Sequence, residues 1–214
     1  MQIKLNNFIP SPLSENYSVN SDLWGKPNLL LNELETTMIL SASGRGKTSL
    51  ISMIYGTRND YIGSLFISGQ NVEAFSAKKW SNLRANKLSI VFQSLKLFPE
   101  LSALNNVNIK NQLTNYKSQA EIEYLFEQLG MTAHKNQLVS HLSFGQQQRI
   151  AIIRALCQPF ETILLDEPFS HLDKNNAQIA WNLIKTESQK QKAGIIITGL
   201  ENEVFIHAAK THTI

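Results

Sequence analysis

The chain has 214 residues, of which 43% are hydrophobic and 17% are charged, and this composition suits one globular domain with a buried core. The formal net charge of +3 is too small to indicate nucleic acid or an anionic membrane surface as a partner. The only cysteine, Cys157, excludes an internal disulfide framework and fits a reducing compartment. We therefore expect a single domain over residues 1–214.

The N-terminal 35 residues give few clear signals. They lack the unbroken apolar core of a signal peptide, and no apolar run in the chain approaches the roughly 18 residues of a membrane span. We expect a protein that is soluble or bound to the periphery of a membrane. Because prolines at positions 10, 12 and 27 interrupt this segment, we interpret it as short antiparallel strands at the flank of the fold.

A strand-to-helix turn follows, in the stretch TTMILSASGRGKTSLI. It fits the phosphate loop G-x-x-x-x-G-K-[ST] except at the first position, where Ser41 replaces glycine and restricts φ. Gly44 and Gly46 allow backbone N–H groups to approach phosphate oxygens closely. Lys47 would reach the outer phosphates, and the Thr48 hydroxyl would hold magnesium. The alternative is a turn rich in glycine and serine that binds nothing.

Short apolar runs alternate with longer helical stretches, which predicts an α/β fold with a mostly parallel sheet. The predicted buried strands are Met38–Leu40, Leu88–Phe92, Thr162–Leu165 and Ile195–Thr198. The segment between the second and third strands predicts a helical insertion. Its amphipathic helices are expected at Gln119–Leu129, which Gly130 would end, and at Gln146–Cys157.

Two carboxylates follow the third predicted strand, in the stretch ETILLDEPFSHLD. Asp166 ends the strand at the edge where open α/β sheets bind ligands, so it is placed to hold a magnesium ion through water. Glu167 is then placed to orient or deprotonate an attacking water. The alternative is that both acids only cap the next loop.

The stretch LSFGQQQRIAIIRAL predicts a helix with an unusual start. Ser143 and Gly145 precede a first turn without acidic residues, so free N–H groups and a hydroxyl are offered to an anion. The alternative is an ordinary serine N-cap.

Taken together, these motifs resemble the nucleotide-binding subunit of ATP-binding cassette (ABC) transporters, from about Leu29 onward. The order is that of the family: the phosphate loop SASGRGKT, the glutamine-loop segment VFQSLKLFPELSALNNV, the signature LSFGQ, the strand ILLDE, and SHLD ending in Asp173. The resemblance implies a P-loop NTPase core with a mostly parallel sheet, a helical insertion and a small antiparallel β flank. The glutamine-loop region is similar to the branch that serves lipoprotein release and macrolide export.

The resemblance also implies roles for individual residues. Glu167 would be the catalytic carboxylate, Gln93 would touch the metal or water and sense the membrane partner, and Thr48, Gln93 and Asp166 would hold Mg²⁺ beside ATP. The phosphate loop would bind ATP through Ser41, Ser43, Gly44, Arg45, Gly46, Lys47, Thr48 and Ser49.

In this family the signature serves a second copy of the subunit. Ser143, Gly145 and Gln146 would contact the γ-phosphate bound by that copy, so two chains would enclose two nucleotides head to tail, with Asp173 at their interface. The expected partners are a second ATP-binding subunit and integral membrane permease subunits, and not nucleic acid. The expected location is the cytoplasmic, inner face of the cell membrane.

Three residues depart from the family pattern: Ser41 in the phosphate loop, Phe144 in place of a signature glycine, and Gly199 in place of the switch histidine. Glycine has no side chain with which to grip the γ-phosphate, so hydrolysis would be slower, or another group or an intact partner site would supply the contact. His171, His207 and His212 are interpreted as surface histidines.

The adenine-stacking residue is ambiguous, because Tyr17 and Trp24 are both candidates and flank packing accounts for either. The strands that usually end the family fold are expected to be shortened or missing after Gly199.

Three functions follow. The main interpretation is an ATPase that energises membrane subunits through ATP-driven dimerisation. The second, favoured by Phe144 and Gly199, is a nucleotide-dependent binding or regulatory protein with little hydrolysis. A small-molecule kinase is disfavoured, because that class does not require LSFGQ before ILLDEP.

Overall fold

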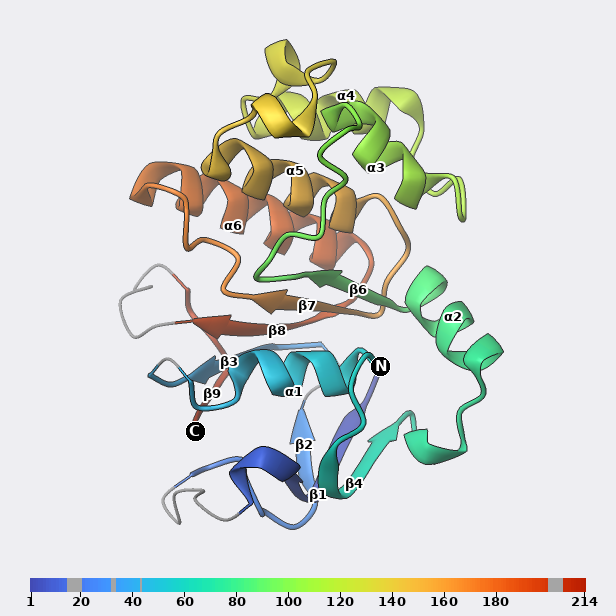
Figure 1. Ribbon diagram of the computed structural model, residues 1–214, viewed down its shortest axis with the longest axis vertical. Coiled ribbons are helices and arrows are strands. Elements are labelled where there is room, and N and C mark those ends of the chain that lie inside the picture. Colours follow the sequence, from blue (N-terminus) through green and yellow to red (C-terminus); the bar gives the residue numbers. More distant parts are fainter. Residues whose placement is uncertain (15–20, 32–33, 43, 200–205) are drawn as a thin grey trace.

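The computed structural model describes residues 1–14, 21–31, 34–42, 44–199 and 206–214. A parallel sheet crosses the middle of the molecule, and in the described residues its strand order is β6–β7–β8–β3–β9 (Figure 1). The strands are β3 (Thr36–Leu40), β6 (Leu88–Val91), β7 (Thr162–Asp166), β8 (Gly194–Gly199) and β9 (Lys210–Thr213). The predicted strands are therefore confirmed, with small differences at their ends.

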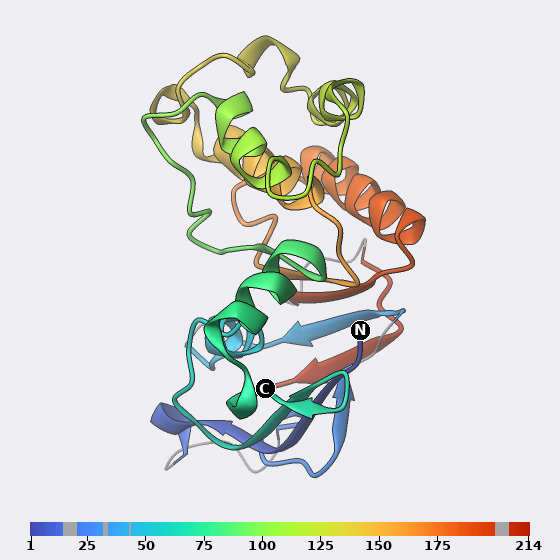
Figure 2. The same ribbon diagram turned by 90° about the vertical axis from the view of Figure 1, so that its right-hand side faces the viewer.

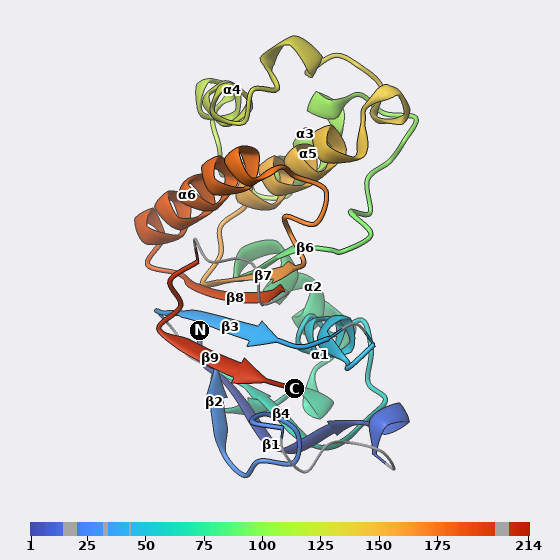
Figure 3. The same cartoon turned by 90° about the vertical axis from the view of Figure 1, so that its left-hand side faces the viewer.

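Strand β9 is a short terminal strand, which fits the expectation that the strands after Gly199 are shortened. It follows Gly199 in the chain and pairs in parallel with β3, so that Met38 lies opposite Thr211. Figure 3 shows β9 at the edge of the sheet beside β3. A terminal strand is thus present, although it is only four residues long.

A smaller antiparallel sheet forms the flank, with the order β2–β1–β4–β5. Its strands are β1 (Ile3–Pro10), β2 (Leu29–Leu31), β4 (Tyr61–Ile67) and β5 (Gln70–Asn71). The prediction of a β flank is confirmed, but half of this sheet comes from the segment after the phosphate loop, which the sequence did not assign to strands. A short 3₁₀ turn, η1 (Ser11–Leu13), follows β1.

Helix α1 (Lys47–Ile54) lies between the two sheets (Figure 1). The strands of the parallel sheet present alternate residues to its two faces, as the two-residue period requires. Ile39, Leu164 and Ile196 pack in the same core as α1, whereas Leu165 and other neighbours along the strands pack in a second core with the helical layer. The phosphate loop at the start of α1 is thus supported by a core on each side of the sheet.

The helices on the other face are α3 (Ala103–Asn111), α4 (Gln119–Gln128), α5 (Phe144–Leu156) and α6 (Lys174–Lys190). The first three lie between β6 and β7 in the chain, which confirms the predicted helical insertion. Helix α4 ends before Gly130, whose φ of 62° fits a C-terminal glycine. The short turns η3 (Thr132–His134) and η4 (Val139–His141) connect α4 to α5.

Helix α2 (Ala77–Asn86) lies along the side of the molecule near the end of α1 (Figure 2) and is preceded by η2 (Val72–Ala74). A Cβ on Gly56 would lie 2.6 Å from the ring of Trp80, so glycine permits this close packing. Among the helices in the described part of the chain, none is both long enough and apolar enough to cross a membrane.

Candidate nucleotide-binding site

The phosphate loop connects β3 to α1 and takes the left-handed backbone that glycine favours. Gly44 has φ of 80° and Gly46 has φ of 97°. Gly46 is the N-cap of α1 and makes no side-chain cap, so the first N–H groups of the helix are available to an anion. A Cβ on Gly46 would be strained at this φ and would lie 2.7 Å from Leu13 Cδ1, so glycine suits the position. Ser43 lies outside the described residues.

Ser41 occupies the first glycine position of the motif without backbone strain. It is not among the residues of positive φ, so serine is compatible with the local conformation. Its hydroxyl donates to the Ala42 carbonyl at 2.8 Å, and its own carbonyl accepts a 2.6 Å hydrogen bond from Lys47 Nζ. The restriction that serine places on φ is therefore met at this position.

Four predicted site residues form one network at the carboxyl edge of the parallel sheet. Lys47 Nζ lies 3.1 Å from Glu167 Oε1. Gln93 Nε2 donates to Glu167 Oε2 at 3.0 Å, and Thr48 Oγ1 donates to Gln93 Oε1 at 3.0 Å. The phosphate loop, the glutamine loop and the end of β7 are thus joined through these side chains.

Asp166, the last residue of β7, is buried beside this network. Its Oδ1 accepts a 2.8 Å hydrogen bond from Thr198 Oγ1, because the parallel register places Thr198 of β8 opposite Asp166. Burial raises the pKa of Asp166, and the bond from Thr198 opposes that rise.

The predicted metal ligands share one cavity. Thr48, Gln93 and Asp166 all line a space of about 560 Å³ on the glutamine-loop side of the site. A hydroxyl, an amide oxygen and a carboxylate are hard oxygen donors, so this set fits Mg²⁺. Among the described residues, no group of three His, Cys, Asp or Glu side chains gathers to hold a metal.

A second cavity, of about 300 Å³, opens over the phosphate loop. Gly44, Gly46, Lys47, Thr48, Ser49, Gln93 and Glu167 line one part of it, and Pro10, Pro12, Leu13 and Arg58 line the rest. The mixed lining offers N–H groups and Lys47 in one part, and an apolar surface beside the Arg58 guanidinium in the other.

Of the two candidates for adenine stacking, the structure describes only Trp24. Trp24 is 4% exposed, and its ring would lie 3.1 Å from a Cβ on Gly46, so it packs beneath the phosphate loop and does not line the cavity. Tyr17 lies outside the described residues. Pro10, Pro12 and Leu13 are apolar cavity residues that the sequence pattern did not assign to the site.

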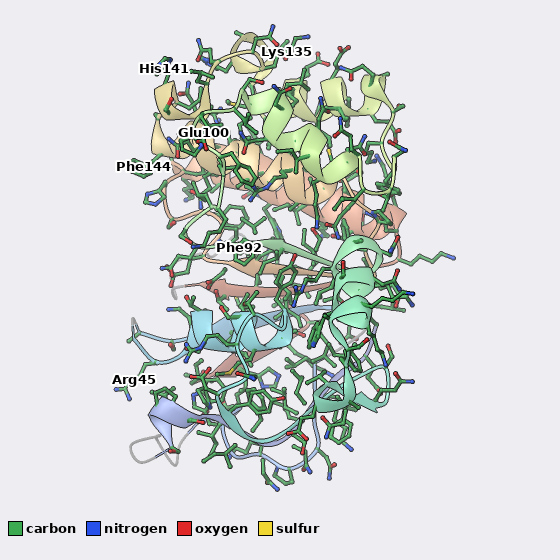
Figure 4. All side chains as sticks on the ribbon, turned by 45° about the vertical axis from the view of Figure 1, so that its right-hand side comes forward. Arg45, Phe92, Glu100, Lys135, His141 and Phe144 are labelled. Carbon is green, nitrogen blue, oxygen red and sulfur yellow. The ribbon has the colours of Figure 1, made fainter. Side chains whose placement is uncertain are left out.

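The signature residues lie apart from this cavity. Ser143 is the N-cap of α5, where its Oγ accepts from Gln146 N at 3.3 Å and Gln146 Oε1 accepts from Ser143 N at 2.8 Å. The hydroxyl is thus engaged as a cap, while the first turn carries no acid, as predicted. Arg45 and Phe144 both lie at the left edge in Figure 4, on the phosphate loop and at the start of α5 respectively. One chain therefore does not close its own signature over its own phosphate loop.

Two of the residues that differ from the family pattern, Phe144 and Gly199, have defined positions in the structure. Phe144 is 68% exposed, and its ring centroid lies 5.4 Å from that of His171. Gly199 ends β8 opposite Leu40. His171, His207 and His212 do not line the cavity over the phosphate loop.

Asp173 caps a helix in this structure. Its Oδ1 accepts from Asn176 N at 2.9 Å at the start of α6, and this backbone bond lowers the pKa of Asp173.

Sequence reasoning missed three polar residues that complete the site. Thr198 bonds Asp166, and Arg58 donates to Ser49 Oγ at 2.8 Å and lines the phosphate-loop cavity. Gln148 of α5 bonds the backbone on both sides of the turn after β7. The predicted parallel strands carried a signal for Thr198, since residues at the ends of neighbouring strands meet at one edge. Nothing in the sequence pattern singled out Arg58 or Gln148.

Comparison with known proteins agrees with this geometry. Residues 25–170 match the ABC transporter family. The chain is 33% identical over 162 residues to the lipoprotein-releasing system ATP-binding protein LolD of Buchnera aphidicola subsp. Schizaphis graminum, over 74% of this chain and 71% of that protein. It is 34% identical over 174 residues to the macrolide export ATP-binding/permease protein MacB of Bartonella henselae, over 80% of this chain and 26% of MacB. The chain thus spans only part of the length of MacB.

Two solved structures share the fold. A dimeric bacterial ABC transporter cassette aligns with a TM-score of 0.74 and 26% identity, over 92% of this chain and 87% of the other. A dimeric ATP-binding cassette in a post-hydrolysis state bound to ADP and Pi aligns with a TM-score of 0.72 and 28% identity, over the same shares. The similarity to LolD and MacB confirms the resemblance of the glutamine-loop segment to the branch that serves lipoprotein release and macrolide export. The chain therefore belongs to the ABC transporter family.

Proposed function

We propose that residues 1–214 act as one ATP-binding domain that binds and hydrolyses ATP with Mg²⁺ and energises separate membrane subunits. The observation that carries this proposal is the network of Lys47, Thr48, Gln93 and Glu167 at the carboxyl edge of the sheet. Glu167, the candidate base, contacts Lys47 directly and is linked to the Thr48 hydroxyl through the amide of Gln93, which supports roles for these groups in phosphate and metal binding. The names of the relatives and the dimeric cassettes support the same function.

The phosphates of ATP would be held by the N–H groups at the start of α1 and by Lys47. Thr48, Gln93 and Asp166 would hold Mg²⁺, which supplies neutralisation of the phosphate charge. Glu167 is paired with Lys47 in this structure, so its carboxylate is partly neutralised. If Lys47 turned toward phosphate, Glu167 would be released to accept a proton from the attacking water, with Gln93 still bonded to its carboxylate.

Turnover would require a second subunit. Ser143, Gly145 and Gln146 lie outside the chain's own phosphate-loop cavity, so they are placed to complete the site of another copy. We infer a head-to-tail homodimer, with Asp173 near its interface. Solved relatives of this fold are dimeric, which supports the inference.

The membrane partner would be a separate permease that docks near Gln93 and the helical layer. Gln93 is suited to relay its movement, because its amide touches both Thr48 and Glu167. LolD is named as part of a lipoprotein-releasing system and MacB as an export protein with a permease part. We infer from these names that the proposed subunit acts in the cytoplasm at the inner face of the cell membrane, and we expect no nucleic-acid partner.

A second candidate function is a nucleotide-dependent binding or regulatory protein with little hydrolysis. Gly199 favours it, because glycine offers no side chain at the switch position. Exposed Phe144 favours it as well, since the ring adds bulk at the signature surface.

Magnesium-dependent ATP hydrolysis by the purified chain separates these functions, measured beside Lys47→Ala and Gly199→His. We expect Lys47→Ala to abolish turnover and Gly199→His to raise it. ATP binding and dimer formation without turnover, in both the parent chain and Gly199→His, would contradict the ATPase proposal and support the regulatory one.

A further inference from the structure

Gln148 is a fully buried amide on α5 whose side chain bonds residues beyond its own helix. Its Nε2 donates to the Glu167 carbonyl at 3.2 Å and lies 3.5 Å from Ser170 Oγ. Its Oε1 accepts from His171 N at 2.8 Å. One side chain thus holds both ends of the turn that follows β7, and its exposed fraction is 0%.

This turn contains an unfavourable backbone conformation. Glu167 has φ of 48°, in the left-handed region that costs a residue with a Cβ on the order of 1 kcal/mol. Its N–H donates to Thr198 O and Oγ1, both at 3.2 Å, and its carbonyl accepts from Gln148. Bonds on both sides of the residue therefore stabilise this conformation.

The backbone conformation of Glu167 decides where its carboxylate points. A change of φ or ψ at this residue would swing the Cα–Cβ bond and separate the carboxylate from Lys47 and Gln93. Gln148 does not line the cavity over the phosphate loop, so it acts on the carboxylate only through the backbone.

The same turn packs tightly on the signature segment. A Cβ on Gly145 would lie 2.8 Å from the His171 carbonyl, so the first turn of α5 packs against the loop too closely to admit a side chain at this point. Gly145 and Gln148 are on one continuous helix, one turn apart. A displacement of the signature would therefore reach the backbone of Glu167 through two contacts.

We propose that Gln148 is a positioning residue that fixes the Glu167 backbone and couples it to the signature segment. Binding of the second subunit's nucleotide at Ser143 and Gly145 would thereby set the orientation of this subunit's own base. The proposal rests on the ATPase function proposed above, and it adds a route by which the two sites of the dimer act together.

The test variant is Gln148→Met, which keeps the length of the side chain and removes its amide. We expect kcat to fall about 100-fold, as a misplacement of about 1 Å does, with the KM for ATP within about twofold of the parent. The Hill coefficient for ATP should fall toward 1. Amide exchange at residues 167–171 should become faster, because His171 N loses its acceptor.

Gln147→Met is the matched control. Gln147 is the neighbouring amide on α5 and donates to Val139 O at 3.2 Å and Leu142 O at 2.9 Å, with no bond to the turn after β7. Urea unfolding of both variants compares their losses of stability. If the role of Gln148 were merely structural, each variant would lose kcat in proportion to its loss of free energy of unfolding.

Three outcomes overturn the proposal: a kcat for Gln148→Met within twofold of Gln147→Met, a loss of ATP binding equal to the loss of kcat, or unchanged exchange at residues 167–171. Failure of the ATPase function itself is visible separately, because the parent chain would then show no turnover. The exchange measurement remains informative about Gln148 in that case.

Discussion

Lys47 of the phosphate loop and Glu167 after β7 form an ion pair, with Nζ 3.1 Å from Oε1. Lys47 is buried and also donates to the Ser41 carbonyl. Both groups have a proposed role toward ATP, Lys47 in binding phosphate and Glu167 as the base. We expect phosphate binding by Lys47 to weaken this pair and free the Glu167 carboxylate.

The first prediction concerns Glu167→Gln. The amide cannot accept a proton from water, so we expect hydrolysis to fall at least about 100-fold while ATP binding and ATP-dependent dimerisation persist. Steady-state hydrolysis and size-exclusion chromatography with ATP measure the two properties. Glu161→Gln is the control, since this partly exposed carboxylate lies just before β7 and pairs with Lys87. Unchanged turnover in Glu167→Gln would remove this residue from the catalytic role.

The second prediction concerns Thr198→Val. Burial raises the pKa of Asp166, and the hydroxyl of Thr198 counteracts it, so the valine variant should raise this pKa further. A metal ligand must be deprotonated, and the acid limb of the pH profile for ATP hydrolysis should therefore move to higher pH. The Mg²⁺ concentration for half-maximal activity should rise most at acid pH. An unshifted acid limb would show that Thr198 does not control Asp166.

The parts of the fold that the sequence predicted depend on local patterns. The buried run before Asp166 and the glycines before Lys47 are readable because hydrophobic burial and positive φ each demand particular residue types. Strand β9 was missed because its residues, KTHT, are polar and largely exposed, and its backbone pairing with β3 holds it in place. Strand β4 similarly lacks a regular burial pattern over its first half.

The missed site residues depend on tertiary register. Thr198 reaches Asp166 only because β8 pairs with β7 in that register, and Gln148 reaches Glu167 only because α5 packs over the turn after β7. In the sequence, Gln148 is one glutamine among three in a row. A helical period distinguishes a buried from an exposed position but does not identify the polar partner of a buried amide.

The third prediction concerns Glu187, which is 1% exposed and accepts hydrogen bonds from Lys117 Nζ at 2.8 Å and Lys190 Nζ at 2.6 Å. Burial alone would raise the pKa of Glu187, but the two lysines outweigh it and the net shift is downward. A lowered pKa stabilises the fold above the unfolded value of about 4.3, and this contribution is lost as pH falls through the folded pKa.

Glu187→Gln should therefore lower the free energy of unfolding by about 3–5 kcal/mol at pH 7, because Lys117 stays buried with a weaker set of partners. The difference from the parent should shrink below about pH 4. Urea unfolding across pH measures this. The control is Glu123→Gln, whose exposed carboxylate lies 3.8 Å from Lys135 and should contribute about 0–1 kcal/mol. A difference that stays constant with pH would contradict the role of the charge.

The fourth prediction concerns Phe144, whose ring stands 68% exposed beside His171 at the start of α5. If the signature closes over the nucleotide of a second subunit, this ring occupies space at the surface of approach. We expect Phe144→Gly to strengthen ATP-dependent dimerisation of the Glu167→Gln chain and to raise kcat in the parent. The variant loses the ring contact with His171 and places glycine in the first turn of α5, so we expect it to be slightly less stable.

Phe98→Gly is the matched control for this change, because Phe98 is also exposed, at 47%, and lies on the segment before α3. We expect it to leave the dimerisation constant unchanged. Sedimentation velocity over a range of ATP concentrations compares the two variants. Weaker dimerisation in Phe144→Gly alone would show that the ring contributes a contact to the second subunit, and the glycine that this position usually carries in the family would then not be the better residue for this chain.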